Sequence, residues 1–272
     1  MTLEIRLKPV EKLLFASDVV AVGKFRCPVT HPLYYDSGPI TNHVFVFPRT
    51  QTRIRHDGGR AFVGNPNVVA LYNEGQLYAR TPISEIDASD WYAVADDVLL
   101  DLVGRDDPAR PFTTTHLPAD ARIYVEQRML FESLDTGLPH DPMEVEETIL
   151  HLLSRIAAAP RRVRRSDADA VEAAREVIAR DPAGRLPLRE IAKASGLSPF
   201  HLCRVFRAQT GTTLTFYRHS LRLRLALDAV RDRSVSLMDL ALDLGFSSHS
   251  HFTAVFRRHF GITPSQFRAI SR

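Results

Sequence analysis

An internal repeat near the end of the chain is the feature that most restricts its fold. Residues 188–217 align with residues 237–267 at an offset of about 50, with one inserted residue. LREIAKASGLS in the first copy matches LMDLALDLGFS in the second. Each copy has a small residue where two helices can cross, a glycine that can end the first helix and a serine that can cap the second. The corresponding residues are Ala192 and Ala241, Gly196 and Gly245, and Ser198 and Ser247. The repeat therefore predicts two helix-turn-helix units.

The remainder of this region is also typical of helix, and no strand pattern appears after about residue 167. Between the copies, the segment from Phe216 to about Arg231 places Leu221, Leu225 and Ala229 at a spacing of four. This spacing predicts one linking helix that holds the copies rigidly apart. A single copy would fit a helical hairpin used only for packing equally well. Two copies favour DNA binding, with the two second helices in successive major grooves about 34 Å apart.

Charge is divided unevenly along the chain. Residues 161–272 hold 20 of the 35 Lys and Arg residues but 10 of the 32 Asp and Glu residues, so their net charge is near +10. Since the whole chain is at +3, residues 1–160 must be near −7. This asymmetry predicts that only the second half contacts a polyanion.

A domain boundary is expected where these two halves meet. In AAAPRRVRRSDAD, Pro160 stops the helical periodicity, and the run of arginines that follows disfavours packing. The sequence thus predicts a linker at residues 161–168 between a first domain at 1–160 and a second domain at 169–272. We interpret the linker as solvated, with contact to phosphates as the open alternative.

The first half carries a strand pattern. Short runs rich in Val, Phe and Tyr recur at roughly 8 to 12 residues between residues 19 and 95, with Asp57-Gly58-Gly59 as a turn. They predict a small barrel or sandwich. Residues 118–135 are then expected to form one helix, and a second has an apolar stripe made of Val145, Ile149, Leu152, Leu153 and Ile156. The stripe can pair with a second copy of the chain or pack on its own barrel. The expected fold class is α+β, with a β-rich domain and a helical pair followed by an all-α domain.

At the repeated residues the chain resembles the AraC/XylS family of transcriptional regulators, over roughly residues 170–270. The second copy, SLMDLALDLGFSSHSHFTAVFRRHFGITPSQFR, is similar to the family signature almost throughout. The resemblance implies a sequence-specific regulator of transcription, with activation as the expected sign, that binds double-stranded DNA and acts with RNA polymerase. It also implies that DNA is read from the positions of Phe200, Cys203 and Arg204 in the first copy and of His249, Ser250, His251 and Ala254 in the second.

Helical geometry extends these positions. Phe200, Cys203, Arg204 and Arg207 share one face of the first recognition helix, opposite Leu202, Val205 and Phe206. We expect Arg204 to read a base, because a guanidinium can make a bidentate contact to guanine. In the second recognition helix, Phe252, Val255 and Phe256 are expected to face the core. The full set of expected DNA contacts is Phe200, His201, Cys203, Arg204, Arg207, Ser248, His249, Ser250, His251, Thr253, Ala254, Arg257 and Arg258.

Ala254 departs from the family pattern, since many relatives carry a long basic residue at that position. Contact with a thymine methyl group, or reliance on DNA shape, is expected to replace a hydrogen bond there.

In the first half, the order of short strands followed by two helices is similar to the cupin-like sensor and dimerisation domain of many of these regulators. This similarity implies a small-molecule effector and a homodimer. Aromatic and polar residues of the strands are where a pocket is expected, although such aromatics also serve for packing alone. The candidates are Tyr34, His43, Tyr72, Tyr78, Arg80 and Trp91.

Several classes of function find no support in the sequence. His31, His43 and His56 form no HxH pair, so neither a metal nor a cupin enzyme is expected, and no other cofactor is implied. Cys27 and Cys203 form no CxxC pair, and Cys27 lacks the companion thiols of an alkyl-accepting repair enzyme with a DNA-binding tail. No apolar run approaches the roughly 18 residues of a membrane span, which predicts a cytoplasmic protein. A ligand-independent regulator stays open as an alternative.

Overall fold

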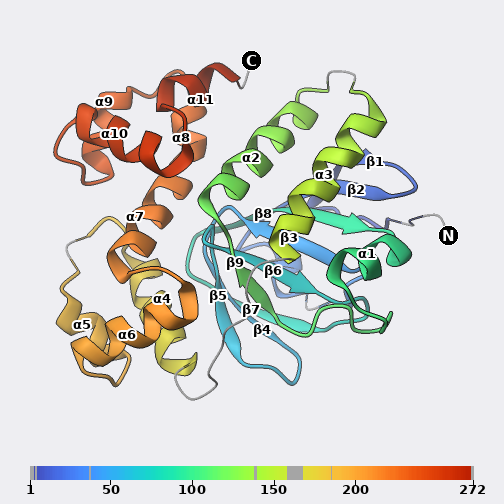
Figure 1. Ribbon diagram of the computed structural model, residues 1–272, viewed down its shortest axis with the longest axis horizontal. Helices are drawn as coiled ribbons and strands as arrows, with labels where there is room; N and C mark the ends of the chain where they lie inside the picture. Colours follow the sequence, from blue (N-terminus) through green and yellow to red (C-terminus); the bar gives the residue numbers. More distant parts are fainter. Residues whose placement is uncertain are drawn as a thin grey trace. The chain divides into compact units, whose positions relative to one another are not determined.

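The computed structural model describes residues 3, 5–36, 38–137, 140–157, 168–184 and 186–270. The chain divides into two compact units, residues 1–160 and residues 161–272 (Figure 1). The predicted linker, residues 161–168, lies outside the described residues except for Ala168, at which the first helix of the second unit begins.

Two antiparallel sheets form the first unit. In the order of pairing, the larger sheet contains β1 (Glu11–Ala16), β2 (Val20–Pro28), β8 (Ile86–Val94), β3 (Val44–Pro48), β6 (Val68–Tyr72) and β9 (His116–Pro118). The smaller sheet contains β5 (Ala61–Gly64), β4 (Thr52–His56) and β7 (Tyr78–Pro82). Ile54 and Phe62 of the smaller sheet share a buried cluster with Ala70 and Tyr72 of the larger one. The sheets therefore face each other, as in double-sheet folds such as the cupins.

A glycine in β2 shapes the space between the sheets. In the antiparallel pairing of β2 with β8, Gly23 lies opposite Trp91. A Cβ atom added to Gly23 would lie 2.1 Å from Cζ2 of Trp91, so the indole ring rests on the glycine backbone. Glycine at this strand position thus makes room for a large aromatic side chain.

The helices of the first unit are η1 (Pro32–Tyr35), α1 (Asp96–Val103), α2 (Ala121–Asp135) and α3 (Pro142–Ala157). Helix α2 packs on the face of the larger sheet that points away from the smaller sheet. Its Tyr124 hydroxyl donates to the carbonyl oxygen of Pro48 over 3.1 Å, and Nε2 of Gln127 donates to Oδ2 of Asp90 over 2.7 Å. Asp90 and Trp91 are neighbours in β8 and point to opposite faces, because side chains alternate along a strand.

The apolar stripe of α3 packs inside the first unit. Its members are at most 4% exposed: Val145, Ile149, Leu152, Leu153 and Ile156. Of the two roles that the sequence left open for this stripe, packing within its own unit is the one observed. Another surface must serve if the first unit forms a dimer.

The described part of the second unit is built from helices. They are α4 (Ala168–Arg180), α5 (Leu188–Ala194), α6 (Pro199–Thr210), α7 (Leu214–Leu225), α8 (Leu227–Arg231), α9 (Leu237–Asp243), α10 (His249–Phe260) and α11 (Pro264–Ile270). The expectation of one linking helix from Phe216 to about Arg231 is wrong in detail. The helix begins at Leu214, after the capping side chain of Thr213. It is interrupted at Ala226, whose N–H contacts the carbonyl oxygens of both Arg222 and Arg224 in a tightened turn.

The second unit has a buried core for each repeat copy. In the first copy, residues from α4 to α7 share one cluster, in which Phe206 and Tyr217 place their rings 5.3 Å apart. In the second copy, the ring of Phe256 lies 5.6 Å from Phe252, 4.6 Å from Phe260 and 6.2 Å from Phe267. Apolar packing thus fixes the helices of each repeat copy against one another.

The predicted α+β fold class is confirmed, with a β-rich part whose last two helices are α2 and α3 and a helical part after it. The strand pattern did not predict β1, α1 or β9. Residues 118–120, expected in the first helix, precede α2, because the side chain of Asp120 accepts hydrogen bonds from the backbone N–H groups of Arg122 and Ile123 and caps the helix.

Candidate nucleic-acid interface and ligand pocket

Each repeat copy folds into two helices joined by a tight turn. Gly196 follows α5 with a φ of +66°, and Gly245 follows α9 with a φ of +74°. This left-handed conformation favours glycine, because a Cβ atom would clash with the backbone. Ala192 and Ala241 are 1% and 0% exposed. The glycines and alanines of the repeat therefore take the conformations and burial that the sequence predicted.

Serines cap both recognition helices. Oγ of Ser198 accepts a hydrogen bond from the N–H of His201 over 3.3 Å at the start of α6, and Oγ of Ser248 accepts one from the N–H of His251 over 3.1 Å at the start of α10. The expected cap Ser247 is therefore wrong by one residue. Ser248 is the last residue with an extended backbone, and Oγ of Ser247 lies 3.0 Å from Nδ1 of His251 instead.

The outward face of α6 carries an unneutralised cation. Phe200 is 82% exposed, and Cys203, Arg204 and Arg207 are exposed as well. The opposite face is buried as predicted and consists of Leu202, Val205 and Phe206. Nη2 of Arg204 donates to Nδ1 of the half-buried His201 over 3.2 Å. No carboxylate in the described part of the chain pairs with Arg204, so its charge is available to a ligand.

The outward face of α10 is polar over most of its length. Its exposed residues are Ser248, His249, Ser250, His251, Ala254, Arg257 and Arg258. Thr253 is half-buried and its hydroxyl group is enclosed, which is less accessible than expected. Val255, expected in the core, is half-buried. The helix packs through a stripe three to four residues apart, Phe252, Phe256, His259 and Phe260, and this stripe leaves Val255 at its edge.

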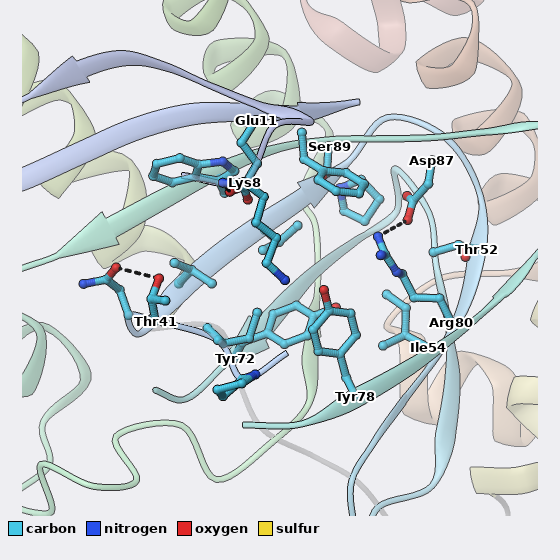
Figure 2. A pocket seen from close by; sticks show the side chains of 18 of the residues that line it. Lys8, Glu11, Thr41, Thr52, Ile54, Tyr72, Tyr78, Arg80, Asp87 and Ser89 are labelled. Atoms are coloured by element: carbon cyan, nitrogen blue, oxygen red, sulfur yellow. Dashed lines mark hydrogen bonds and ion pairs between the residues drawn. The ribbon is translucent and has the colours of Figure 1, made fainter. Parts of the chain in front are cut away.

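A pocket with a volume of about 120 Å³ lies between the two sheets of the first unit (Figure 2). Apolar and aromatic side chains make up most of its wall: Phe25, Ile40, Val44, Val46, Ile54, Tyr72, Tyr78 and Trp91. Five charged side chains also line it: Arg6, Lys8, Glu11, Arg80 and Asp87. In Figure 2, Lys8 and Tyr78 extend toward the middle of the pocket, and Arg80 and Asp87 meet at one end.

Two cations at this pocket, Arg80 and Lys8, form ion pairs within the protein. Nη1 of Arg80 lies 3.0 Å from Oδ2 of Asp87, and Nη2 donates to the carbonyl oxygen of Tyr34 over 2.6 Å. Burial raises the pKa of the Asp87 carboxyl, while Arg80 favours its charged form. Nζ of Lys8 lies 2.8 Å from Oδ2 of Asp36. The pocket thus offers aromatic walls, and its Arg80 and Lys8 side chains are each held by a carboxylate.

Four of the six residues expected at a pocket line this one: Tyr72, Tyr78, Arg80 and Trp91. His43 does not, because Val44 and Val46 of β3 face the pocket. The His43 ring instead lies 6.3 Å from that of Phe112, on the side of Phe45.

Tyr34 lies behind Arg80 and does not reach the pocket. Its side chain is fully buried, its hydroxyl lies 2.9 Å from Oγ1 of Thr52, and its ring centre lies 4.8 Å from the guanidinium carbon of Arg80. Sequence reasoning also missed Phe25, Ile54 and Asp87. The signal for Asp87 was its spacing of four from Trp91 in β8, which places both on one face of the strand.

A metal site, a disulfide and a membrane span each have requirements that the described residues do not meet. Among them, no three His, Cys, Asp or Glu side chains come together as possible metal ligands. Cys27 is buried and Cys203 exposed, and both are free thiols. None of the described helices is long and apolar enough to cross a membrane.

Comparison with known proteins relates the second unit to regulators of transcription. Residues 191–270 match the family model described as a helix-turn-helix domain. Over 78 residues, 29% of this chain, the sequence is 42% identical to the probable transcription factor PqrA of Proteus vulgaris and 44% identical to the regulatory protein SoxS of Escherichia coli. The matched segment spans 64% of PqrA and 73% of SoxS. This chain belongs to the AraC/XylS family of transcriptional regulators.

A solved structure of an AraC-type regulator from Chromobacterium violaceum is also similar, with 30% identity over 40% of this chain and 96% of that chain, and a TM-score of 0.37. The matched helix-turn-helix domain and the identity to SoxS confirm the resemblance to the AraC/XylS family that the repeat indicated, and members of this family bind DNA through their helix-turn-helix units. The matched family model lies wholly within the second unit.

Proposed function

We propose that this protein is a sequence-specific DNA-binding activator of transcription whose helices α6 and α10 enter two adjacent major grooves of double-stranded DNA. The main support is the matched pair of recognition helices. Each is preceded by a glycine in the left-handed backbone conformation and is capped by a serine. Arg204 on the first helix is exposed and pairs with no described carboxylate, and Arg257 and Arg258 are exposed on the second. The excess of cations in residues 161–272 supports phosphate binding by the same unit.

Footprinting tests this proposal. The full-length chain is used to select duplexes from a randomised library, and the selected duplex is then probed for protection. We expect two protected segments about one helical turn apart for each bound chain, since each recognition helix contacts one major groove. Protection of a single short segment would contradict the two-groove arrangement, and selection of no sequence would contradict specific binding.

We also propose that the pocket of the first unit binds a small, uncharged effector with an aromatic or short aliphatic body. An engineered cavity of roughly 150 Å³ takes up benzene, and the pocket here is of similar size, about 120 Å³. Tyr72, Tyr78 and Trp91 supply aromatic walls for such a ligand. Because Arg80 and Lys8 are paired with Asp87 and Asp36, these two cations have little to gain from an anionic ligand.

Trp91 is the single tryptophan of the chain and lines the pocket, so its fluorescence reports on occupancy directly. A panel of small neutral aromatic and aliphatic compounds is titrated against the full-length protein. Tyr78→Ala is expected to weaken the response, whereas Tyr35→Ala, at a tyrosine that is 67% exposed and outside the pocket, is the matched control. If no compound changes the emission while DNA binding is intact, the ligand-independent regulator is the better description.

We propose that the first unit forms a homodimer and that the activator contacts RNA polymerase in the cytoplasm. The chain has no proposed catalytic role, in keeping with the regulators that it resembles. Sedimentation of the full-length protein tests the dimer, and in vitro transcription from a promoter carrying the selected duplex tests both the polymerase contact and the sign of regulation.

A further inference from the structure

A basic groove in the second unit lies between the two helix-turn-helix units and was not among the expected DNA contacts. We call it the linking-helix groove. Its floor is α7, from which Arg218, His219 and Arg222 line it. One wall is the turn ahead of α5, which includes Leu186, and the other is the turn between α9 and α10, which includes Ser247. Its open volume is about 710 Å³.

Arg222 holds the two walls of this groove together. Nη2 of Arg222 donates to the carbonyl oxygen of Ala183 over 3.1 Å, and its Nε also donates to that of Pro182. Nη1 donates to the carbonyl oxygen of Leu244 over 3.4 Å. Its donors are thus directed to the backbone on both sides, and its role is to position the two helix-turn-helix units.

The guanidinium of Arg218 has N–H donors that make no hydrogen bond to the described residues. Among the described residues, it donates one hydrogen bond, from Nη1 to the carbonyl oxygen of Leu186 over 3.4 Å, which is at the long end of the accepted range. No carboxylate in the described part of the chain pairs with it. A guanidinium in this state can donate to an anion in the groove without giving up an ion pair.

The groove has a positive potential. The pKa of His219 lies below its ordinary value because burial disfavours the charged ring and because Arg222, Arg218 and His251 repel a proton. The pKa of Arg222 is lowered by burial and by Arg218, and Asp181 acts in the opposite sense more weakly. An anion in the groove would relieve this repulsion.

The groove opens beside a recognition helix. Ser247 in its wall lies 3.0 Å, Oγ to Nδ1, from His251 in the first turn of α10. When two recognition helices occupy successive major grooves, the phosphate backbone crosses the surface between them. Helix α7 lies between the two helix-turn-helix units along the chain, at this surface.

We propose that the linking-helix groove is a third DNA contact, in which Arg218 and His219 bind the phosphate backbone between the two major grooves. This inference rests on the proposed function, because it needs both recognition helices on one duplex. It adds affinity that is independent of base sequence but dependent on the path of the backbone between the two half-sites.

The test compares Arg218→Gln and His219→Gln with wild-type full-length protein on the selected duplex. Arg180→Gln is the matched control, because Arg180 is an exposed arginine of the same unit that pairs with Glu176 on its own helix. Arg218→Gln is expected to weaken binding roughly tenfold, as for the loss of one hydrogen bond to a charged group. The slope of log affinity against log salt should become shallower by about one unit. Arg180→Gln should change neither quantity.

A second set of duplexes carries uncharged methylphosphonates either between the two half-sites or outside them. We expect the central substitution to weaken wild-type binding and to have little further effect on Arg218→Gln. His219→Gln is measured in the same way, so that the result does not depend on a single variant, and thermal unfolding of each variant verifies the fold. If both variants keep the wild-type salt slope and remain as sensitive to central methylphosphonates, the groove makes no backbone contact. Should the wild-type protein select no sequence at all, the proposed function fails instead, and that outcome is seen before any variant is compared.

Discussion

Nη2 of Arg204 donates a hydrogen bond to Nδ1 of His201, 3.2 Å away and one turn earlier on α6. The contact restrains the direction of the guanidinium without neutralising it, because a neutral imidazole nitrogen accepts the bond. A guanidinium that is restrained but has no carboxylate partner loses less conformational freedom on binding a base edge than an unrestrained one does.

The first prediction is that Arg204→Ala relaxes base preference at one position of the DNA site. The loss on the preferred duplex should be roughly 1 to 3 kcal/mol, the range for one bidentate contact to a base. Competition binding over a randomised site measures the preference. If Arg204→Ala lowers stability but leaves every base preference unchanged, Arg204 has only a packing role.

The second prediction is that Arg258→Ala weakens binding about equally for all sequences. Arg258 is exposed in the last turns of α10, away from the helix N-terminus where base edges are contacted. A lost phosphate contact should also make the salt slope shallower by about one unit. Titrations at several salt concentrations on a selected and an unrelated duplex give both quantities, and a selective loss on the selected duplex would mean that Arg258 reads a base.

The architecture of the second unit could be predicted because its signals are local. Gly196 and Gly245 mark turns, and the matched spacing of apolar residues marks helices, whatever the rest of the chain does. The position of one cap could not be settled in this way. Ser247 and Ser248 are both competent caps, and only the backbone conformation of Ser248 decides between them.

The pocket of the first unit was harder to predict because it depends on which strands face each other. Alternation places Tyr78 and Arg80 on one face of β7, and both line the pocket. It also separates His43 from Val44 and Val46, but only the observed register shows which face of β3 is inward. Whether Arg218 has a carboxylate partner depends on contacts between segments far apart in sequence, and no local pattern shows that none of the described carboxylates pairs with it.

The third prediction concerns the two neighbouring serines. Ser248→Ala should lower the free energy of unfolding by about 1 kcal/mol, because it leaves the N–H of His251 without its acceptor at the helix start. Ser247→Ala is the matched control and should cost less, since its hydroxyl contacts only the exposed His251 ring. Urea unfolding of both variants compares them directly. A larger loss for Ser247→Ala than for Ser248→Ala would mean that Ser247 caps the helix and that Ser248 does not.

The fourth prediction is that the two units fold and function separately. The fragment from Ser166 to Arg272 should bind the selected duplex, and residues 1–160 should self-associate without binding DNA. Limited proteolysis is expected to cut near Arg161 to Arg165, in the arginine-rich segment between the units. The opposite distribution of activities between the fragments would refute the division.

The last prediction concerns His56, which lies in the core of the first unit at 2% exposure. Its ring centre lies 4.5 Å from that of Tyr72 and 5.6 Å from that of Phe62, and its Nε2 has no hydrogen-bond partner in the described part of the chain. Burial lowers the pKa of His56 to about 4. In the unfolded chain the pKa returns to about 6.5, so between these values the unfolded state binds a proton that the folded state does not.

Stability contributed by neutral His56 is therefore fully present above about pH 6.5 and falls as the pH drops toward 4. From pH 7 to pH 5 the free energy of unfolding should decrease by about 2 kcal/mol through this residue. His56→Phe should remove this part of the pH dependence, because phenylalanine fits among the same aromatic rings without titrating. His151→Phe, at an exposed position of α3, is the matched control and should leave the pH dependence as it is. Urea unfolding at pH 7 and pH 5 gives the comparison, and an equal pH dependence in wild type and His56→Phe would mean that His56 is already protonated in the folded protein or is exposed to solvent.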